Sequence, residues 1–542
     1  MTINYIFCSY KIRIEYKTRK DSLALYWLRS DQTSDGTHPF LLTNNQFTNA
    51  RGIFPCQDSP EIRFTYTAKI SVSKAIRIIV GGRQCKSIIK GDQDHRTHIF
   101  YETNPMPSYA IIIMAGSLMS SKHNNFITLW AEEKHFMQSK KVLKFCKHAI
   151  NITNELCGFP IQDEFNICVL PSNIPEIELQ CRTMIFVSST LLDEDPIFMC
   201  DTIARKIAQS WAGGLVTCRN FQHLWLIKSF SIFISSKILQ SRYRFTKQIT
   251  FMRKRIFFDL NIKMRLYGID SQQKLVPSLT DILPKNITKS VPDEVGYYLL
   301  DSLQKDLGGS TVFAQYLKHY MQTFCYQSID TFDWKDHLFS YFDSKHEILI
   351  SRLDKWLYKL NLVSVYDDLY DSVQNLCEIL TQQWITTNTT DKFSSELTDI
   401  LLYDDIFKMY FLNYLYASPI ALPIGKLDQR TLQSNTYISH IFCRFLLLSL
   451  YIRNEWEVMV HPALKFAREY CASTFACPIF HDLYKLEQTR GEAISGFTAI
   501  VEKKSKMLPQ TMEDIASVLK INLKDIYKLI SEESTSHVRT DQ

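Results

Sequence analysis

The stretch from Asp201 to Ser235, DTIARKIAQSWAGGLVTCRNFQHLWLIKSFSIFIS, constrains the fold of this chain more than any other. Its apolar residues first recur at helical spacing. A glycine pair then stands at Gly213-Gly214, and a second apolar run opens near Trp225. The pattern predicts two helices joined by a tight turn and a short loop. Residues four apart on a helix share one face, so Arg205 and Gln209 should project in the same direction.

This stretch resembles the zinc core of the gluzincin aminopeptidases (peptidase family M1), in the branch of leukotriene-A(4) hydrolase and aminopeptidase B. That core reads His-Glu-x-x-His-Ser-Trp-x-Gly-Asn-x-Val-Thr and, further on, Trp-Leu-Asn-Glu-Gly. The frame persists here in residues 210–217 and 223–226. The third ligand position follows the second by nineteen residues, as in the family, so no insertion has displaced it. The four positions of the metal ligands and the general base carry, in chain order, Arg205, Lys206, Gln209 and Lys228.

These side chains cannot supply the chemistry that the resemblance implies. Zinc takes imidazole or carboxylate donors, whereas arginine has no lone pair to give and Lys228 would first have to lose a proton. A divalent ion about 4 Å from one such cation is repelled by roughly 8 kcal/mol at an effective dielectric near 20. We therefore predict no zinc cofactor. With Lys206 at the position of the catalytic glutamate, we also predict no general base.

Other functional positions that the resemblance implies have changed as well. The amine-binding acid of the family's Gly-x-Met-Glu-Asn motif falls on Gln180, and the tyrosine that stabilises the tetrahedral intermediate falls on Asp293. The basic pair that grips a substrate carboxylate falls on Ala472 and Thr474. Only Gln46, in the stretch that contributes to the substrate pocket, is unchanged.

The charge of the implied pocket is reversed, and Asp293 and Glu294 would neutralise it only in part. Two explanations remain open. In the first, long basic side chains pair with local acids in a site that no longer performs catalysis. In the second, a retained cleft binds an anion such as an acidic peptide or a phosphate. Altered catalysis is a third explanation, which we favour less than these two. The candidate anion-binding residues are Arg205, Lys206, Lys228 and Lys285.

The fold class implied by the resemblance is a multidomain α+β architecture. It comprises a partial N-terminal β saddle domain at 1–118, a thermolysin-like aminopeptidase domain at 119–360 and an armadillo- or HEAT-like helical domain at 370–510. An extra helix and a polar tail fill 511–542. The first half of the family's β domain has no counterpart here. A half sheet exposes an edge, so either the edge is covered in another way or the sequence is incomplete.

Periodicity supports this division. Alternating residues predict strands, and apolar residues at three-to-four spacing predict helices. The expected strands are Ile12–Tyr16, Arg63–Val72, Phe126–Trp130 and Phe165–Pro171. The expected helices of the last part are Ser372–Leu380, Ser394–Met409, Tyr437–Asn454, Trp456–Tyr470 and Met512–Ile530.

Composition narrows the possible partners and the expected location of the protein. A net charge of +6 without a basic-aromatic array argues against a nucleic-acid partner. No window of eighteen apolar residues and no secretory signal is present, so we expect neither membrane association nor export. Fourteen cysteines without a regular framework fit a reducing compartment, and we expect a cytoplasmic protein. The sequence indicates no oligomeric state.

The favoured function is therefore that of a catalytically inactive relative, a pseudo-aminopeptidase that acts by binding a peptide, an anion or an acidic protein partner. The alternative is a zinc metalloaminopeptidase that cleaves N-terminal residues from peptides, with replacement ligands such as His223 or the cysteines. A third possibility is a decaying duplicate without function.

Overall fold

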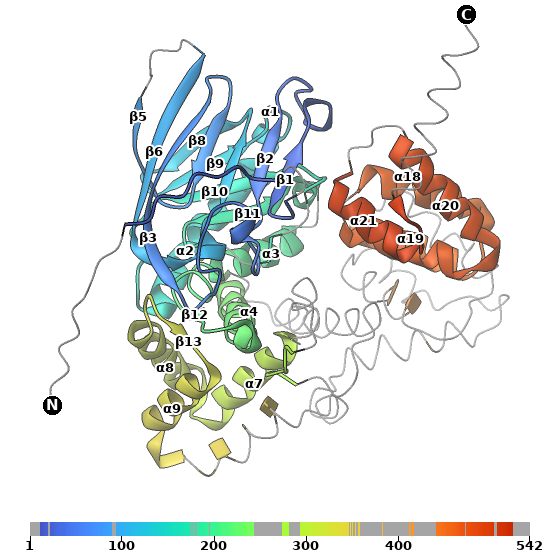
Figure 1. The fold of residues 1–542 in the computed structure, drawn as a ribbon. Helices are drawn as coiled ribbons and strands as arrows, with labels where there is room; N and C mark the ends of the chain where they lie inside the picture. The colour runs from blue at the N-terminus through green and yellow to red at the C-terminus, as the bar shows by residue number, and fades with distance from the viewer. Residues whose placement is uncertain are drawn as a thin grey trace, which may run out of the picture.

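The computed structural model describes residues 11–19, 22–88, 94–174, 177–178, 181–193, 196–242, 274–280, 293–345, 441–471, 473–502 and 507–523, together with isolated positions between 347 and 416. Sheets make up the first part of the chain, helices the middle and the last part (Figure 1). In the described part of the chain, no helix is long and apolar enough to cross a membrane.

Two antiparallel sheets open the chain, in the orders β1-β2-β7-β4 and β3-β6-β5. Their strands are β1 Leu25–Leu28, β2 Phe40–Thr43, β3 Arg63–Ser73, β4 Arg77–Val80, β5 Arg83–Ile88, β6 His95–Pro107 and β7 Ile113–Gly116. The predicted strand Arg63–Val72 is confirmed as β3, whose side chains alternate along its length as the sequence does. A small apolar cluster, which includes Ile78, Val80 and Phe100, lies between strands of the two sheets.

The predicted strand at Ile12–Tyr16 was wrong. Residues 11–19 form no strand, and Ile12, Ile14 and Tyr16 are exposed. Alternation gives a segment two chemically different faces, but a strand also needs a neighbour that accepts and donates its backbone hydrogen bonds. No described strand takes that place beside this segment.

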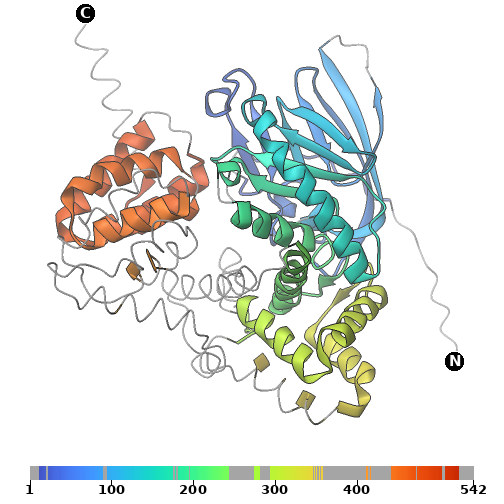
Figure 2. The same cartoon turned by 180° about the vertical axis from the view of Figure 1, so that it is seen from behind.

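A mixed sheet in the order β11-β10-β9-β8 follows. Its strands are β8 Met119–Asn124, β9 Ile127–Ala131, β10 Phe165–Leu170 and β11 Met184–Ser188. The last three run parallel and β8 runs antiparallel to β9, so the predicted strands Phe126–Trp130 and Phe165–Pro171 are confirmed as β9 and β10. Helices cover one face of this sheet (Figure 2). They are α1 Glu133–Ser139, α2 Lys141–Cys157 and α3 Pro196–Ala208.

Two central helices carry the stretch from which the prediction began. α3 ends at Ala208, and α4 runs over Leu224–Arg242, which confirms the predicted second helix near Trp225. Fifteen of the nineteen residues of α4 are buried, so this helix lies inside the molecule and has no broad polar face to solvent. Any charged side chain on it must find its partner within the protein.

Three further helices pack below α4: α7 Asp293–Asp306, α8 Gly309–Thr323 and α9 Thr331–Tyr341 (Figure 1). A two-residue parallel ladder joins β12, Thr217–Cys218, to β13, Ser328–Ile329. Trp225 of α4 meets Trp334 of α9 edge to face, with ring centroids 5.0 Å apart, and both rings are fully buried. Such pairs add about 0.5–1.5 kcal/mol to the free energy of burial.

The last part of the chain is helical. Its helices are α17 Ile441–Arg453, α18 Val460–Glu469, α19 Ser473–Lys485, α20 Glu487–Glu502 and α21 Pro509–Val518. α17 and α18 confirm the predicted helices Tyr437–Asn454 and Trp456–Tyr470. The predicted helices Ser372–Leu380 and Ser394–Met409 lie outside the described residues, as does the polar tail.

A single helix over Met512–Ile530 was wrong, because α21 begins at Pro509 and ends at Val518. Lys520 adopts a left-handed conformation, with φ 55°. The backbone N–H of Ile521 then donates to the carbonyl of Ala516, with a distance of 2.9 Å, which closes the helix. A glycine usually occupies the left-handed position at such a helix end. Residue 520 is a lysine, so the end of the helix could not be predicted from the sequence.

Candidate functional site

The first three positions of the candidate site lie at the end of α3. The backbone N–H of Gln209 donates to the carbonyl of Arg205, so the helical hydrogen bonds continue one residue past α3. Arg205 and Gln209 are therefore one turn apart, as the sequence predicts. Arg205 forms an ion pair with Asp201 on its own helix, with Nε and Oδ2 3.4 Å apart. Gln209 Oε1 is buried and accepts no hydrogen bond from the described residues.

The glycine turn after α3 is held on both sides. Gly213 has φ +127°, and its carbonyl accepts a hydrogen bond of 2.9 Å from the buried hydroxyl of Tyr109. A Cβ on Gly214 would lie 2.5 Å from the Ser210 carbonyl oxygen and 2.8 Å from Arg182 Cα. Only glycine permits this approach of two backbones, so the turn sets the distance between the end of α3 and the segment that leads into β11.

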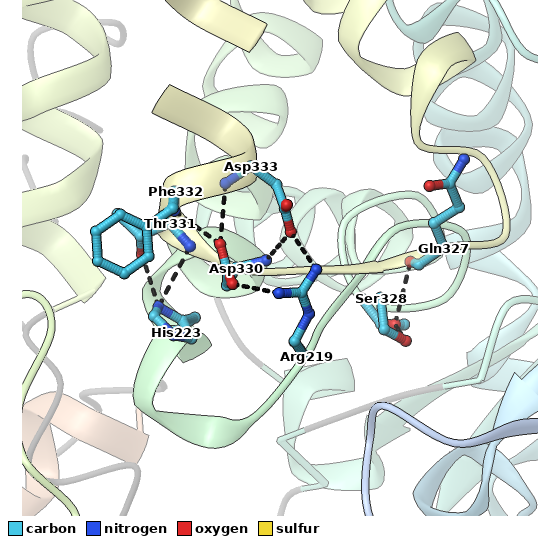
Figure 3. Close-up of polar contacts among 9 residues, drawn as sticks. Arg219, His223, Gln327, Ser328, Asp330, Thr331, Phe332 and Asp333 are labelled. Carbon is cyan, nitrogen blue, oxygen red and sulfur yellow. Dashed lines mark hydrogen bonds and ion pairs between the residues drawn. The ribbon is translucent and has the colours of Figure 1, made fainter. Parts of the chain in front are cut away.

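A polar network fixes the start of α4 (Figure 3). Arg219 donates to the carboxylates of Asp330 and Asp333 at 2.5 and 2.7 Å, just before and within α9. The Asp330 carboxylate also caps α9 by accepting from the backbone N–H groups of Phe332 and Asp333. Since α4 begins five residues after Arg219, this network fixes α4 against α9.

His223 belongs to the same network. Its Nδ1 accepts from the backbone N–H of Thr331 at 3.3 Å and lies 2.8 Å from the Thr331 hydroxyl, which also accepts from Trp225 Nε1. Burial lowers the pKa of His223, which keeps the ring neutral with its proton on Nε2. Nδ1 of His223, one of the two ring nitrogens that could bind a metal, is therefore already used to hold α4 against α9.

Lys228 lies in the second turn of α4, with its side chain 7% exposed. Its ammonium group donates to Glu178 Oε2 at 2.8 Å. Burying an unpaired ammonium group would cost several kcal/mol, and the pairing with Glu178 offsets part of that cost. No motif or periodicity in the sequence points to Glu178 as this partner.

Lys206 reaches the same segment from α3. It is buried, and its ammonium group donates to the Ile177 carbonyl at 2.7 Å. Gln46 Oε1 accepts from the backbone N–H of Glu178 at 3.0 Å. Two ammonium groups from different helices and one amide therefore meet on residues 177 and 178. We call Lys206, Lys228, Ile177, Glu178 and Gln46 the lysine cluster.

The side chains of this site do not fit a zinc ion. Of the four positions implied by the family resemblance, three carry cations that are already bonded to protein oxygens, and Gln209 offers one amide oxygen. Within the described ranges, no three histidine, cysteine, aspartate or glutamate side chains are placed to hold a metal ion. Cys146 and Cys157, on the same helix as His148, are fully buried, and burial raises the pKa of both thiols.

Some of the positions named from the sequence are not described. Gln180, Lys285 and Ala472 lie outside the described residues, and for Asp293 and Thr474 only the backbone is described, at the starts of α7 and α19. Arg205, Lys206 and Lys228 were, with Lys285, the candidates for an anion site, one of the two explanations left open by the sequence. The structure brings Lys206 and Lys228 to one segment, whereas Arg205 pairs along its own helix.

Comparison with known proteins assigns the class of this fold and site. Residues 3–110 match the peptidase M1 N-terminal domain, and residues 172–356 match the peptidase family M1 domain. The chain belongs to peptidase family M1, as the resemblance in the Asp201–Ser235 stretch implied.

Individual relatives agree with this assignment. The chain is 28% identical to leukotriene A-4 hydrolase of Xenopus laevis over 524 residues, which cover 94% of this chain and 84% of that protein. It is also 28% identical to leucine aminopeptidase 2 of Candida glabrata over 404 residues, which cover 72% of this chain and 60% of that protein. The structure of yeast LTA4 hydrolase in complex with bestatin matches with a TM-score of 0.78 at 23% identity, over 93% of this chain and 81% of that one, which shows a common fold.

Proposed function

We propose that this protein is a catalytically inactive member of peptidase family M1 that acts by binding. The observation that carries the proposal is the lysine cluster. The positions of the general base and of the third metal ligand hold ammonium groups that donate to Ile177 and Glu178. An ammonium group cannot accept the proton that a general base must take, nor donate electrons to a metal.

The proposed partner is an acidic peptide or an acidic protein in the cytoplasm. Support comes from the net charge of the chain, +6, and from the three cations that stand where the family holds a metal and its ligands. In the finer description of the fold that we propose, a partial β saddle domain precedes the thermolysin-like domain, and the last helices form an armadillo-like superstructure. Its concave face is a second surface for the same kind of partner.

The alternative function is that of a zinc metalloaminopeptidase, and it is favoured by family membership. The relatives are described as a leukotriene A-4 hydrolase and a leucine aminopeptidase. For this chain, such an activity would need ligands from outside the four expected positions. His223 is a poor replacement, because its Nδ1 is bonded to Thr331 and the ring is buried.

Metal content and hydrolysis test the proposal together. The purified chain is analysed for zinc by elemental analysis and assayed with aminoacyl amides, beside a zinc-loaded family M1 aminopeptidase. We expect no stoichiometric zinc and no turnover. The matched variant carries Arg205→His, Lys206→Glu, Gln209→His and Lys228→Glu, which restores the donor set, and we expect it to retain zinc. Stoichiometric zinc with chelator-sensitive turnover in the unaltered chain would contradict the proposal.

A further inference from the structure

Residues 11–19 form an exposed segment that has the residue pattern of a strand but no neighbouring strand. Ile12, Ile14 and Tyr16 alternate with charged residues, and they are 83%, 55% and 54% exposed. No described strand pairs with this segment. Its backbone and its apolar face are therefore available to a sheet edge that takes up the hydrogen bonds of an added strand.

β3 offers such an edge. It lies at one end of its sheet, in the order β3-β6-β5, and at eleven residues it is the longest strand at an end of any described sheet. From Tyr66 to Ser73 it pairs with β6 without interruption, and its other side joins no ladder among the described strands. Proteins usually protect such an edge with a bulge, a proline or several charges. This stretch contains one charged residue, Lys69, and no proline.

The two faces of β3 match the two faces of the segment. One face of β3 is half-buried and packs against the small apolar cluster between the first two sheets; its residues are Tyr66, Ala68, Ile70 and Val72. The residues between them are exposed and, apart from Lys69, uncharged. A strand added at this edge therefore extends the apolar face with Ile12, Ile14 and Tyr16 and leaves its charged residues in solvent.

Charge selects the register of the added strand. Glu15 is the one acid of residues 11–19, and Lys69 is the one charged residue between Tyr66 and Ser73. Glu15 pairs with Arg13 of its own segment, but both side chains are exposed, and such a surface pair contributes little. Opposite charges that face each other across two strands stabilise the pairing. With Glu15 opposite Lys69, an antiparallel strand pairs Ile14 with Ile70, Tyr16 with Ala68, Ile12 with Val72 and Arg13 with Ser71.

A second copy of the chain is the better source of this strand. Within one chain the segment is followed by β1, and β1 and β3 lie on opposite sides of the strands at the start of the chain (Figure 1). The segment would have to run along β3 and its continuation would have to cross to β1. The segment of another copy is free of this constraint, because its own β1 lies elsewhere.

We propose that two copies of this chain exchange residues 11–17, so that the segment of each copy adds as an antiparallel strand to the outer edge of β3 in the other copy. The exchange is reciprocal, which makes the assembly a closed two-fold dimer. This inference concerns self-association and is independent of the binding function proposed above.

Reversal of single charges tests the proposed register. The full chain is compared by sedimentation equilibrium, over a range of protein concentrations, with Glu15→Lys, with Lys69→Glu and with the combination of both. The matched controls are Glu492→Lys on α20 and Lys465→Glu on α18, which make the same changes at exposed residues elsewhere. All these side chains are exposed, so the variants should fold, and circular dichroism and the melting temperature verify that they do.

We expect the unaltered chain to form a dimer. Each single reversal places like charges opposite each other, and a two-fold dimer contains the pair twice, so the dissociation constant of the dimer should rise about tenfold. The combined variant restores opposite charges and should dimerise about as tightly as the unaltered chain. The two control variants should also dimerise like the unaltered chain.

Cysteine cross-linking identifies the occupant of the edge. In the antiparallel register, Arg13→Cys combined with Ser71→Cys should give a covalent dimer after mild oxidation, seen on a gel without reductant. Arg13→Cys combined with Thr67→Cys is the matched control, because these residues face each other only if the strands run parallel. The single variants correct for cross-links through the native cysteines.

Three outcomes would overturn the proposal. A chain that stays monomeric at all concentrations does not exchange the segment. A dimer whose affinity neither charge reversal alters uses another surface. A disulfide that forms between residues 13 and 71 within one chain would show that the segment lies on its own β3 and that no exchange takes place.

Discussion

The sequence shows that lysines stand at positions 206 and 228 of the site, but it does not show which residues they contact. The sequence shows that both stand where an acid would serve in the family, and it places them on neighbouring helices. The contacts to Ile177 and Glu178 join residues 29 and 50 positions apart, and no periodicity reports such a pairing. Asp201 is the contrasting case, because an acid four residues before Arg205 on a helix is an ion pair that can be read from the sequence.

Gly296 is a single residue on which the position of α4 depends. A Cβ at Gly296 of α7 would lie 2.1 Å from Ser229 Oγ and 2.7 Å from Ser229 Cβ. We predict that Gly296→Ala lowers the free energy of unfolding by about 1–3 kcal/mol, as overpacking does, measured by urea denaturation. Ser229→Gly in the same chain should restore part of the loss.

Gly491 is the matched control for that change. It lies within α20, and a Cβ there meets nothing within 4 Å. Gly491→Ala should therefore leave the protein as stable or make it more stable by about 0.5–1 kcal/mol. An equal loss of stability in both variants would contradict the close packing of α7 on α4.

At the scale of elements, α8 and α9 meet through a pair of histidines. His319 Nδ1 and His337 Nε2 are 2.8 Å apart, with the rings stacked at 4.9 Å between centroids. Burial, together with the neighbouring His319, lowers the pKa of His337 to about 4. A proton on His337 would lose the solvation that an exposed imidazolium has and would face a second imidazole.

This pair predicts a pH dependence of stability. The unfolded chain binds a proton at residue 337 below its ordinary pKa of about 6.5, whereas the folded chain does not until about pH 4, so stability should fall as the pH falls through this window. In His337→Gln this part of the slope should disappear. Urea denaturation at several pH values between 4 and 7 measures it, with the exposed His461→Gln on α18 as the control. Identical slopes in His337→Gln and the unaltered chain would show that the pair does not titrate in this way.

At the scale of the whole molecule, arginines join the first sheets to the rest of the chain. Arg63 of β3 donates to the Thr217 hydroxyl at 2.7 Å and to the Gln327 carbonyl at 3.2 Å. Arg182, just before β11, is buried between Asp163 and Glu102 of β6. Burial opposes its charge, yet the two carboxylates raise the pKa of Arg182 above its ordinary value. The segment just before α21 contacts the first sheet as well, since Gln32 Nε2, between β1 and β2, donates to the Met507 carbonyl at 3.4 Å.

Arg182→Met tests this connection. The substitution leaves Asp163 and Glu102 without their shared cation, and we predict a loss of about 3–5 kcal/mol in the free energy of unfolding. Thermal and urea unfolding measure it, with the exposed Arg468→Met on α18 as the control. A loss no greater than that of the control would mean that the two carboxylates are solvated and that the connection is weak.

The sequence by itself determined the family, the order of sheets and helices, and the loss of the donors at positions 205, 206, 209 and 228. Motif spacing and periodicity are local properties, and they persist wherever the chain folds. Only the tertiary structure decided what replaced those donors, because the partners of Lys206 and Lys228 come from a segment that neither helix pattern includes. The tertiary structure also decided the two segments that depart from prediction. Ile12–Tyr16 is not a strand, because a strand needs a neighbour that takes up its backbone hydrogen bonds. Met512–Ile530 is not one helix, because a helix ends where its terminal carbonyls find other donors.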